Sequence, residues 1–276
     1  YGVLKNMVKS ETAEKAQIHF NINAKVGQQA ESYSLKIEGE KINIEAQDEA
    51  GLFYAFVTLS QIIEDAQGKL FPLLEINDAP KIAFRPIQID IKHHREKESY
   101  YYELMDHLAQ LKINGVILEI EDKLQYKRRP EVGSDDAMTI DQWKAISEYA
   151  QQRNINISPL VQGLGHASFI LKHEKNFALR DDPKSDWAFN PLDTKTYELQ
   201  FDLYLDAMEA TPYGKYLHVG GDEVKTTGRN SGISALELNI IWLNKVSAFA
   251  AEHNRIPIFW DDMPLKEAGL MSPIYD

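Results

Sequence analysis

Two adjacent carboxyl side chains, Asp222 and Glu223, are the residues of this sequence best suited to chemistry. They follow a short apolar run and a pair of glycines in the stretch HVGGDEV. One charged carboxylate raises the pKa of its neighbour, which suits acid and base work. Neighbouring residues on a strand point to opposite sides of the backbone, with Cα atoms about 3.8 Å apart. One short and one long acid at a strand end can therefore serve two neighbouring atoms of a single substrate.

Similar polar residues follow other short apolar runs in the second part of the chain. The runs are PIQIDI, GVILEI, INISPLV, YLHVGG and IPIFW, and longer amphipathic segments separate them. The residues at or just after the ends of these runs are Asp90, Lys92, His93, Glu119, Glu121, Asp122, Gln162, Gly165, His166, Asp222, Glu223, Trp260, Asp261 and Asp262. Strands that alternate with helices and are apolar almost throughout predict a parallel sheet covered by helices.

The spread of polar strand ends favours a (β/α)8 TIM barrel over an open doubly wound sheet. A barrel collects catalytic groups from many strands at one face, whereas a doubly wound sheet binds at one switch point, usually with a glycine-rich phosphate turn. The nearest candidate for such a turn, GLGHAS, lacks the third glycine. Only five βα units precede the final SPIYD. We therefore expect residues 84–276 to be the N-terminal part of a truncated barrel that needs roughly three more units.

Residues 1–83 predict a small α+β domain in front of the barrel. ESYSLKIEG and EKINIEAQD alternate apolar and polar residues, as two half-buried strands do. The next segment has apolar residues at helical spacing, namely Leu52, Phe56, Leu59 and Ile63. Asp48 is the expected cap of this helix and Gly68 its expected stop. The boundary between the two domains is expected near Phe84.

Composition excludes several classes of function. The formal net charge of −12 argues against a nucleic acid or an anionic membrane as partner. The absence of cysteine excludes disulfides, thiolate catalysis and cysteine-bound zinc. No run approaches the ~20 apolar residues that cross a bilayer, so we expect no membrane insertion. The segment YGVLKNMVKS has no signal pattern. If a signal peptide was removed before Tyr1, we expect a periplasmic or secreted protein, and otherwise a cytoplasmic one.

The stretch HVGGDEV resembles the catalytic signature of glycoside hydrolase family 20, the β-N-acetylhexosaminidases. The small N-terminal domain of that family typically reads E-x-Y-x-L…I-x-I-x-A…A-G-x-F/Y-Y-G…T-L-x-Q. The residues that fit this pattern are Glu31, Tyr33, Leu35, Ile42, Ile44, Ala46, Ala50, Gly51, Phe53, Tyr54, Thr58, Leu59 and Gln61, with Ala55 in place of a glycine. The resemblance covers nearly the whole chain and rests on two separate motifs.

The resemblance implies an exo-acting, retaining hydrolase that removes a terminal β-linked GalNAc or GlcNAc from a glycan or glycoconjugate. It implies that Glu223 is the general acid and then the base for water, and that Asp222 holds the N–H of the 2-acetamido group. The acetamido oxygen attacks the anomeric carbon and gives an oxazolinium intermediate, an exception among retaining glycosidases. GLGHAS resembles a Gly-His element of the family, which makes His166 an active-site partner. Neither a cofactor nor a metal is implied.

The sequence departs from the main branch of the family at two positions. His93 stands where that branch has an arginine that grips sugar hydroxyls, and Glu119 stands where it has a histidine. Asp122 sits where many members have an aspartate. These features, with PLVQGLGHASFILKHEKN, FNP and WDDM, resemble the hexosaminidase D branch. Members of that branch often favour galactosamine glycosides, although both epimers remain candidates here.

The candidate substrate-binding residues are His166, Asp122, Trp260, His93, Asp90 and His218. Trp260 is expected to end a strand, where an aromatic ring can stack on a sugar. His218 lies inside a strand and is either a core histidine or a neighbour of the pocket. Two alternatives stay open: a non-catalytic carbohydrate-binding barrel, or a fragment that is inactive without its missing strands. A metal-dependent hydrolase that uses His93, His166, His218 and Asp222 is a third.

Overall fold

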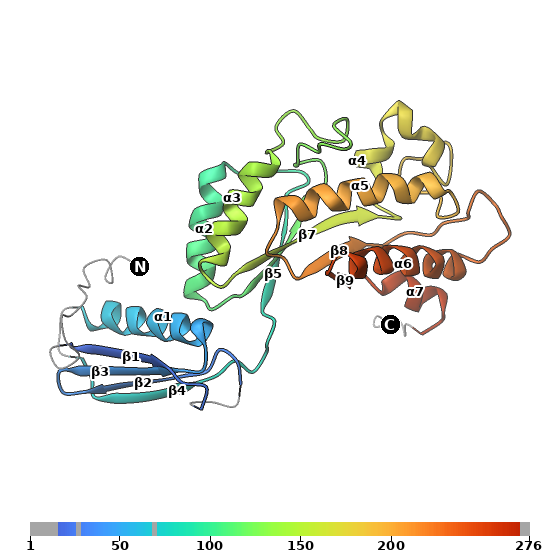
Figure 1. Ribbon diagram of the computed structural model, residues 1–276. Coiled ribbons are helices and arrows are strands. Elements are labelled where there is room, and N and C mark those ends of the chain that lie inside the picture. Colours follow the sequence, from blue (N-terminus) through green and yellow to red (C-terminus); the bar gives the residue numbers. More distant parts are fainter. Residues whose placement is uncertain (1–15, 26–28, 68–70, 271–276) are drawn as a thin grey trace. The chain divides into compact units, whose positions relative to one another are not determined.

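Residues 16–25, 29–67 and 71–270 are described by a computed structural model, which divides the chain into two compact units (Figure 1). Unit 1 comprises Tyr1–Arg85 and Asp106–Asn114, and unit 2 comprises Pro86–Met105 and Gly115–Asp276. Within these described ranges, no helix has the length and apolarity needed to cross a membrane. The expected helix stop at Gly68 lies outside the described residues.

Unit 1 is a four-stranded sheet with a helix along one face (Figure 1). Its elements are β1 (Ile18–Ile22), β2 (Tyr33–Glu38), β3 (Lys41–Ala46), α1 (Glu49–Ala66) and β4 (Leu74–Asp78). The strand order is β1-β3-β2-β4, with β1 parallel to β3 and the other pairs antiparallel. The buried core joins the alternating residues of β2 and β3 to one side of α1: Tyr33, Leu35, Ile37, Ile42, Ile44, Ala46, Tyr54, Ala55 and Leu59. The two predicted strands and the predicted helix are thus confirmed, whereas β1 was not predicted.

Asp48 fixes the junction between this sheet and α1. Its Oδ1 accepts the backbone N–H of Gly51 at 2.8 Å and caps the helix, as predicted. Its Oδ2 accepts the N–H of Glu31 at 2.9 Å, just before β2 begins. A Cβ at Gly51 would lie 2.5 Å from the carbonyl oxygen of Ser32, so only glycine allows the first helical turn to pack this closely.

The segment Asp106–Asn114 belongs to unit 1 through polar contacts with the sheet. Lys112 Nζ lies 2.8 Å from Asp78 Oδ2 and 2.8 Å from the Tyr33 hydroxyl. Arg85 forms an ion pair with Glu31 at 2.6 Å, and its backbone N–H donates to the side chain of Asn114 at 2.7 Å.

Unit 2 is an all-parallel sheet whose strands are in chain order. Its strands are β5 (Pro86–Asp90), β6 (Gly115–Glu119), β7 (Asn156–Gly163), β8 (Tyr216–Gly220) and β9 (Ile256–Ile258). Their order in the sheet is β5-β6-β7-β8-β9, and every neighbouring pair is parallel. A doubly wound sheet reverses its strand order at a switch point, and this sheet does not. The sequential order is that of successive units of a barrel, and all five predicted strands are present.

Helices connect these strands at the predicted places. The longer ones are α2 (Glu98–Gln110), α3 (Ile140–Gln151), α5 (Thr194–Ala210) and α6 (Ala235–Glu252), and the shorter ones are α4 (Ser168–Leu171), the 3-10 helix η3 (Glu174–Leu179) and α7 (Asp262–Glu267). Reciprocal hydrogen bonds between Thr139 and Gln142 cap the start of α3, and the side chain of Asp193 caps the start of α5. Helices α3 and α5 pack on β7 and on each other, and α6 packs on β9.

Two local features of the strands bear on the site. Leu160 pairs with His218 and Gly163 pairs with Gly220, so two residues of β7 oppose a single residue of β8. Such a bulge bends its strand and redirects the side chain of the extra residue. The last strand is shorter than predicted, because β9 ends at Ile258 and not at Trp260.

We predict that Asp48→Ala destabilises unit 1, because it removes both the cap of α1 and the bond to Glu31. The expected loss is about 1–2 kcal/mol in the free energy of unfolding, measured by urea titration with far-UV circular dichroism. Asp65→Ala is the matched control, since Asp65 is an exposed residue of the same helix. A loss for Asp48→Ala no larger than that for Asp65→Ala would contradict the assignment of this cap.

Candidate active site

The turn that leaves β8 sets the direction of both candidate acids. Gly220 and Gly221 have φ values of +76° and +97°, in the left-handed region that favours glycine. A Cβ at Gly220 would lie 2.0 Å from Oε1 of Gln162, and one at Gly221 would lie 3.0 Å from the ring of Trp242. Both the conformation and the lack of space therefore require glycine here. Glu223 is also left-handed, with φ +47°, which is uncommon for a residue with a side chain.

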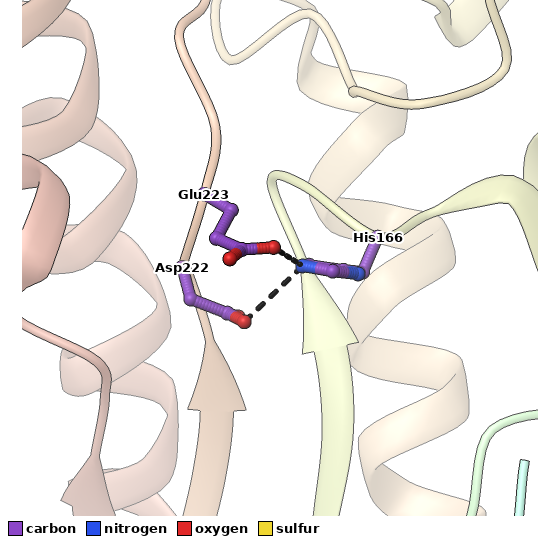
Figure 2. A group of neighbouring side chains, drawn as sticks. All are labelled: His166, Asp222 and Glu223. Atoms are coloured by element: carbon purple, nitrogen blue, oxygen red, sulfur yellow. Dashed lines mark ion pairs between the residues drawn. The ribbon is translucent and has the colours of Figure 1, made fainter.

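This bent backbone brings Asp222 and Glu223 to one partner, His166. Nε2 of His166 lies 3.1 Å from Asp222 Oδ2 and 3.4 Å from Glu223 Oε2. Figure 2 shows both carboxylates pointing at the same ring nitrogen. On a regular strand the two side chains would diverge. The left-handed turn at Glu223 instead lets both acids act at one place.

His166 is held in place by Trp187, a residue that the sequence analysis missed. The two ring centroids are 4.3 Å apart, with an angle of 53° between the ring planes. His166 is itself left-handed, with φ +50°, in the loop that follows β7. The indole N–H of Trp187 donates to the backbone oxygen of Glu223 at 3.4 Å. Trp187 therefore touches both the histidine and the acid, although it lies in a loop where no sequence pattern marks it.

The two acids differ in their surroundings. The side chain of Asp222 is 22% exposed and that of Glu223 is 72% exposed. Burial raises the pKa of Asp222, while His166, the backbone N–H of Asp222 itself and the Gln162 amide act in the opposite direction, and Asp262 adds to the rise. Oδ1 of Asp222 is buried and makes no hydrogen bond of ordinary geometry with any described residue. This oxygen is therefore available as an acceptor for a ligand.

Asp262 fixes the backbone of Glu223 from the start of α7. Its Oδ2 accepts the N–H of Glu223 at 3.1 Å. Asp262 follows a predicted strand end, where the sequence alone assigns it no specific partner. The contact restrains the turn without touching the Glu223 carboxylate.

His218 and Trp260 form a second contact beside this turn. Their ring centroids are 4.8 Å apart, with His218 buried and Trp260 38% exposed. Burial lowers the pKa of His218 to about 4, so the ring is neutral near pH 7. Its Nδ1 accepts the N–H of Gly220 at 3.1 Å, which places the proton on Nε2. The backbone N–H of Trp260 donates to the carbonyl oxygen of Gly220 at 3.0 Å.

The other predicted site residues lie at the ends of β5 and β6. Asp90 forms an ion pair with Lys92 at 3.1 Å, and His93 is exposed just after the strand. Asp122 is largely buried and lies 3.3 Å from Lys123 and 3.6 Å from Lys172. None of these three predicted residues contacts the group of His166, Asp222 and Glu223 through an ion pair or hydrogen bond in the described part of the chain.

The same group of three side chains has the geometry to bind a cation. One donor atom from each of His166, Asp222 and Glu223 lies within 4.8 Å of the other two. One nitrogen and two carboxylate oxygens are ligands that zinc accepts. The arrangement thus allows two uses of these side chains, proton transfer or cation binding.

Comparison with known proteins identifies the family. The profile "Glycosyl hydrolase family 20, domain 2" matches residues 2–79, and "Glycosyl hydrolase family 20, catalytic domain" matches residues 83–273. Hexosaminidase D of Bos taurus is 27% identical over 191 residues, which cover 65% of this chain and 55% of that protein. Hexosaminidase D of Homo sapiens is 27% identical over 197 residues, covering 65% of this chain and 39% of that protein.

The fold is likewise similar to that of solved structures. The β-N-acetylhexosaminidase from Bacteroides fragilis NCTC 9343 superposes with a TM-score of 0.79 at 23% identity, covering 92% of this chain and 56% of that one. The chain spans about half the length of the relatives that it matches. Its five βα units are those of a (β/α)8 barrel that follows a small domain, and the chain belongs to glycosyl hydrolase family 20.

Proposed function

We propose that this protein is an exo-acting β-N-acetylhexosaminidase that retains the anomeric configuration. The observation that carries the proposal is the convergence of Asp222 and Glu223 on one nitrogen of His166. Two carboxylates so close together suit one substrate whose own acetamide is the nucleophile. Retaining enzymes with a carboxylate nucleophile instead place two separate carboxyl groups about 5–5.5 Å apart, on either side of the bond.

Each acid has a separate task in the proposed reaction. The free Oδ1 of Asp222 accepts the acetamide N–H, which orients the acetamide oxygen toward the anomeric carbon. A bond forms between that oxygen and the anomeric carbon as the glycosidic C–O bond breaks, and Glu223 gives its proton to the leaving oxygen. Water then attacks the anomeric carbon of the oxazolinium, Glu223 takes the proton from that water, and the acetamide is restored. Two inversions at one carbon give net retention.

The proposed substrate is a glycan or glycoconjugate that ends in β-linked GalNAc or GlcNAc. Relatives named hexosaminidase D support an N-acetylhexosamine at the reactive position. Trp260 is proposed to line the pocket, since it is partly exposed beside the acids on a neighbouring strand end, and an aromatic face can stack on a sugar ring. His93, Asp90 and Asp122 are proposed to contact the sugar at more distant strand ends.

We predict that Glu223→Gln lowers kcat for an aryl β-N-acetylhexosaminide with a poor leaving group by about 10²- to 10⁴-fold, the usual contribution of a general acid. Substrates with a good leaving group need less protonation and should lose less. Circular dichroism should show an unchanged fold.

A chelator should leave the turnover of the wild type unchanged. A loss of turnover in the presence of the chelator would instead favour a metal-dependent reaction at the same three side chains. Sugar binding by the wild type without any turnover would favour a non-catalytic barrel.

We predict that Asp222→Ala loses both turnover and affinity for a thiazoline mimic of the intermediate, because the acetamide is no longer held. Calorimetry measures the affinity and steady-state kinetics the turnover. Asp135→Ala is the control, since Asp135 is exposed in a loop after β6. Normal turnover by Asp222→Ala would show that the substrate does not assist the reaction.

We predict that His166→Ala moves the acid limb of kcat/KM toward higher pH. Asp222 must be ionised to accept the acetamide N–H, and its ionised fraction at a given pH falls as its pKa rises. Burial already raises that pKa and His166 lowers it, so removing His166 raises it further. The measurement is a pH–rate profile beside that of His94→Ala, a change at an exposed histidine. An acid limb that stays in place or moves to lower pH would contradict the proposed electrostatics.

A further inference from the structure

Asp181 is a buried carboxylate that holds the loop after β8 but is not one of the two candidate acids. It lies in the segment between η3 and α5 and is 5% exposed. Its Oδ2 accepts the backbone N–H of Thr227 at 2.7 Å and the Thr227 hydroxyl at 3.0 Å. Its Oδ1 accepts the backbone N–H of Arg229 at 3.0 Å. Both oxygens therefore act as acceptors, which an ionised carboxylate can provide and a side-chain amide cannot.

The loop that Asp181 holds begins at Glu223. In the described part of the chain, the backbone N–H groups of residues 224–230 that bond to a distant segment are those of Thr227 and Arg229. Asp181 accepts both of them. The backbone at Arg229 is left-handed, with φ +56°, so the loop turns sharply where it meets the carboxylate. Asp181 is therefore the anchor of this loop at its far end.

The segment that carries Asp181 also carries Trp187. The backbone N–H of Asp181 donates to the carbonyl oxygen of Ala188 at 2.9 Å, which fixes the two parts of the segment to each other. Trp187, the neighbour of Ala188, lies with its ring centroid 4.3 Å from that of His166 and donates to the backbone oxygen of Glu223. One short segment thus contacts the loop that carries His166 and both ends of the loop that begins at Glu223.

We propose that Asp181 is a positioning residue for Glu223 and that it acts by fixing the loop of residues 223–229. The inference rests on the proposed role of Glu223 as general acid. Glu223 has φ +47°, a strained conformation that persists only where the surroundings hold it. Its side chain is 72% exposed, so the backbone, and not side-chain packing, sets its direction. The restraints are Asp262 at its N–H, Trp187 at its carbonyl oxygen and Asp181 at the far end of the loop.

Asp181→Asn tests this role. It keeps the shape of the side chain but places an NH2 group opposite a backbone N–H, so at least one anchoring bond is lost. We expect kcat for an aryl β-N-acetylhexosaminide with a poor leaving group to fall about tenfold, the contribution of one hydrogen bond to a charged group. A substrate with a good leaving group should keep its rate, because it needs less protonation by Glu223. The thiazoline mimic, which Asp222 holds, should keep its affinity, whereas a general loss of fold would lower all three.

Asp182→Asn is the matched control, because Asp182 is exposed and accepts the N–H of Lys184 within its own loop. It should behave as the wild type does. Thr227→Val removes one of the three bonds to Asp181 and should give the same pattern with a smaller loss. The double variant Asp181→Asn/Glu223→Gln should lose no more than Glu223→Gln alone, because the two changes act in series. An unchanged rate in Asp181→Asn, equal losses on good and poor leaving groups, or losses that multiply in the double variant would overturn the proposal.

Amide hydrogen exchange tests the same link without turnover. In the wild type, the backbone N–H groups of Thr227, Arg229 and Glu223 should exchange slowly, because each donates to a carboxylate. Asp181→Asn should speed exchange at all three, including Glu223, whose own acceptor Asp262 is unchanged. Faster exchange at Thr227 and Arg229 with no change at Glu223 would overturn the proposal. A Glu223→Gln variant that loses equally on good and poor leaving groups would instead contradict the proposed function, and not the link from Asp181 that exchange measures.

Discussion

The contact of two adjacent carboxylates with a single imidazole nitrogen is the constraint on which the rest of the site depends. Like charges on neighbouring residues repel, and a regular strand would turn Asp222 and Glu223 to opposite sides. Here both lie within 3.4 Å of Nε2 of His166. Only a sharply turned backbone permits this arrangement, and the left-handed conformations of Gly220, Gly221 and Glu223 provide it.

The packing behind the strand ends makes that turn rigid. A Cβ at Gly163 would lie 2.8 Å from the ring of Trp242 and 2.9 Å from the hydroxyl of Tyr204, so the ends of β7 and β8 press on side chains of α5 and α6. The indole N–H of Trp242 also donates to the side chain of Gln200 at 3.0 Å and joins the two helices. Close-packed interiors transmit such constraints because they have little room to relax. The helices thus locate the acids through glycines that no larger residue can replace.

Features that depend on local patterns could be predicted from the sequence. The alternation in β2 and β3, the cap at Asp48 and the five apolar strands are local, and all were found. The strand β1 was not predicted because its residues are only half-buried or exposed. It becomes a strand by pairing with β3, a segment more than twenty residues away. Periodicity carries no information about such a partner.

The site shows the same division between local and distant information. The motif HVGGDEV pointed to Asp222 and Glu223, and GLGHAS pointed to His166, because each is a short run of unusual residues. Trp187 and the bonds from Asp181 to the loop after β8 were not predicted. They arise where loops far apart in sequence meet, 46 residues apart for Asp181 and Thr227. Nor does a strand pattern reveal the bulge between β7 and β8, since a bulge depends on the register with the neighbouring strand.

In the proposed reaction, Asp222 orients an acetamide that itself attacks the anomeric carbon. The most direct test uses aryl β-N-acetylhexosaminides whose acetyl group carries none, one, two or three fluorine atoms. Fluorine withdraws electrons from the acetamide oxygen and weakens it as a nucleophile, while the leaving group stays the same. If the acetamide oxygen is the nucleophile, kcat/KM falls steeply with each added fluorine. A rate independent of fluorination would contradict this mechanism.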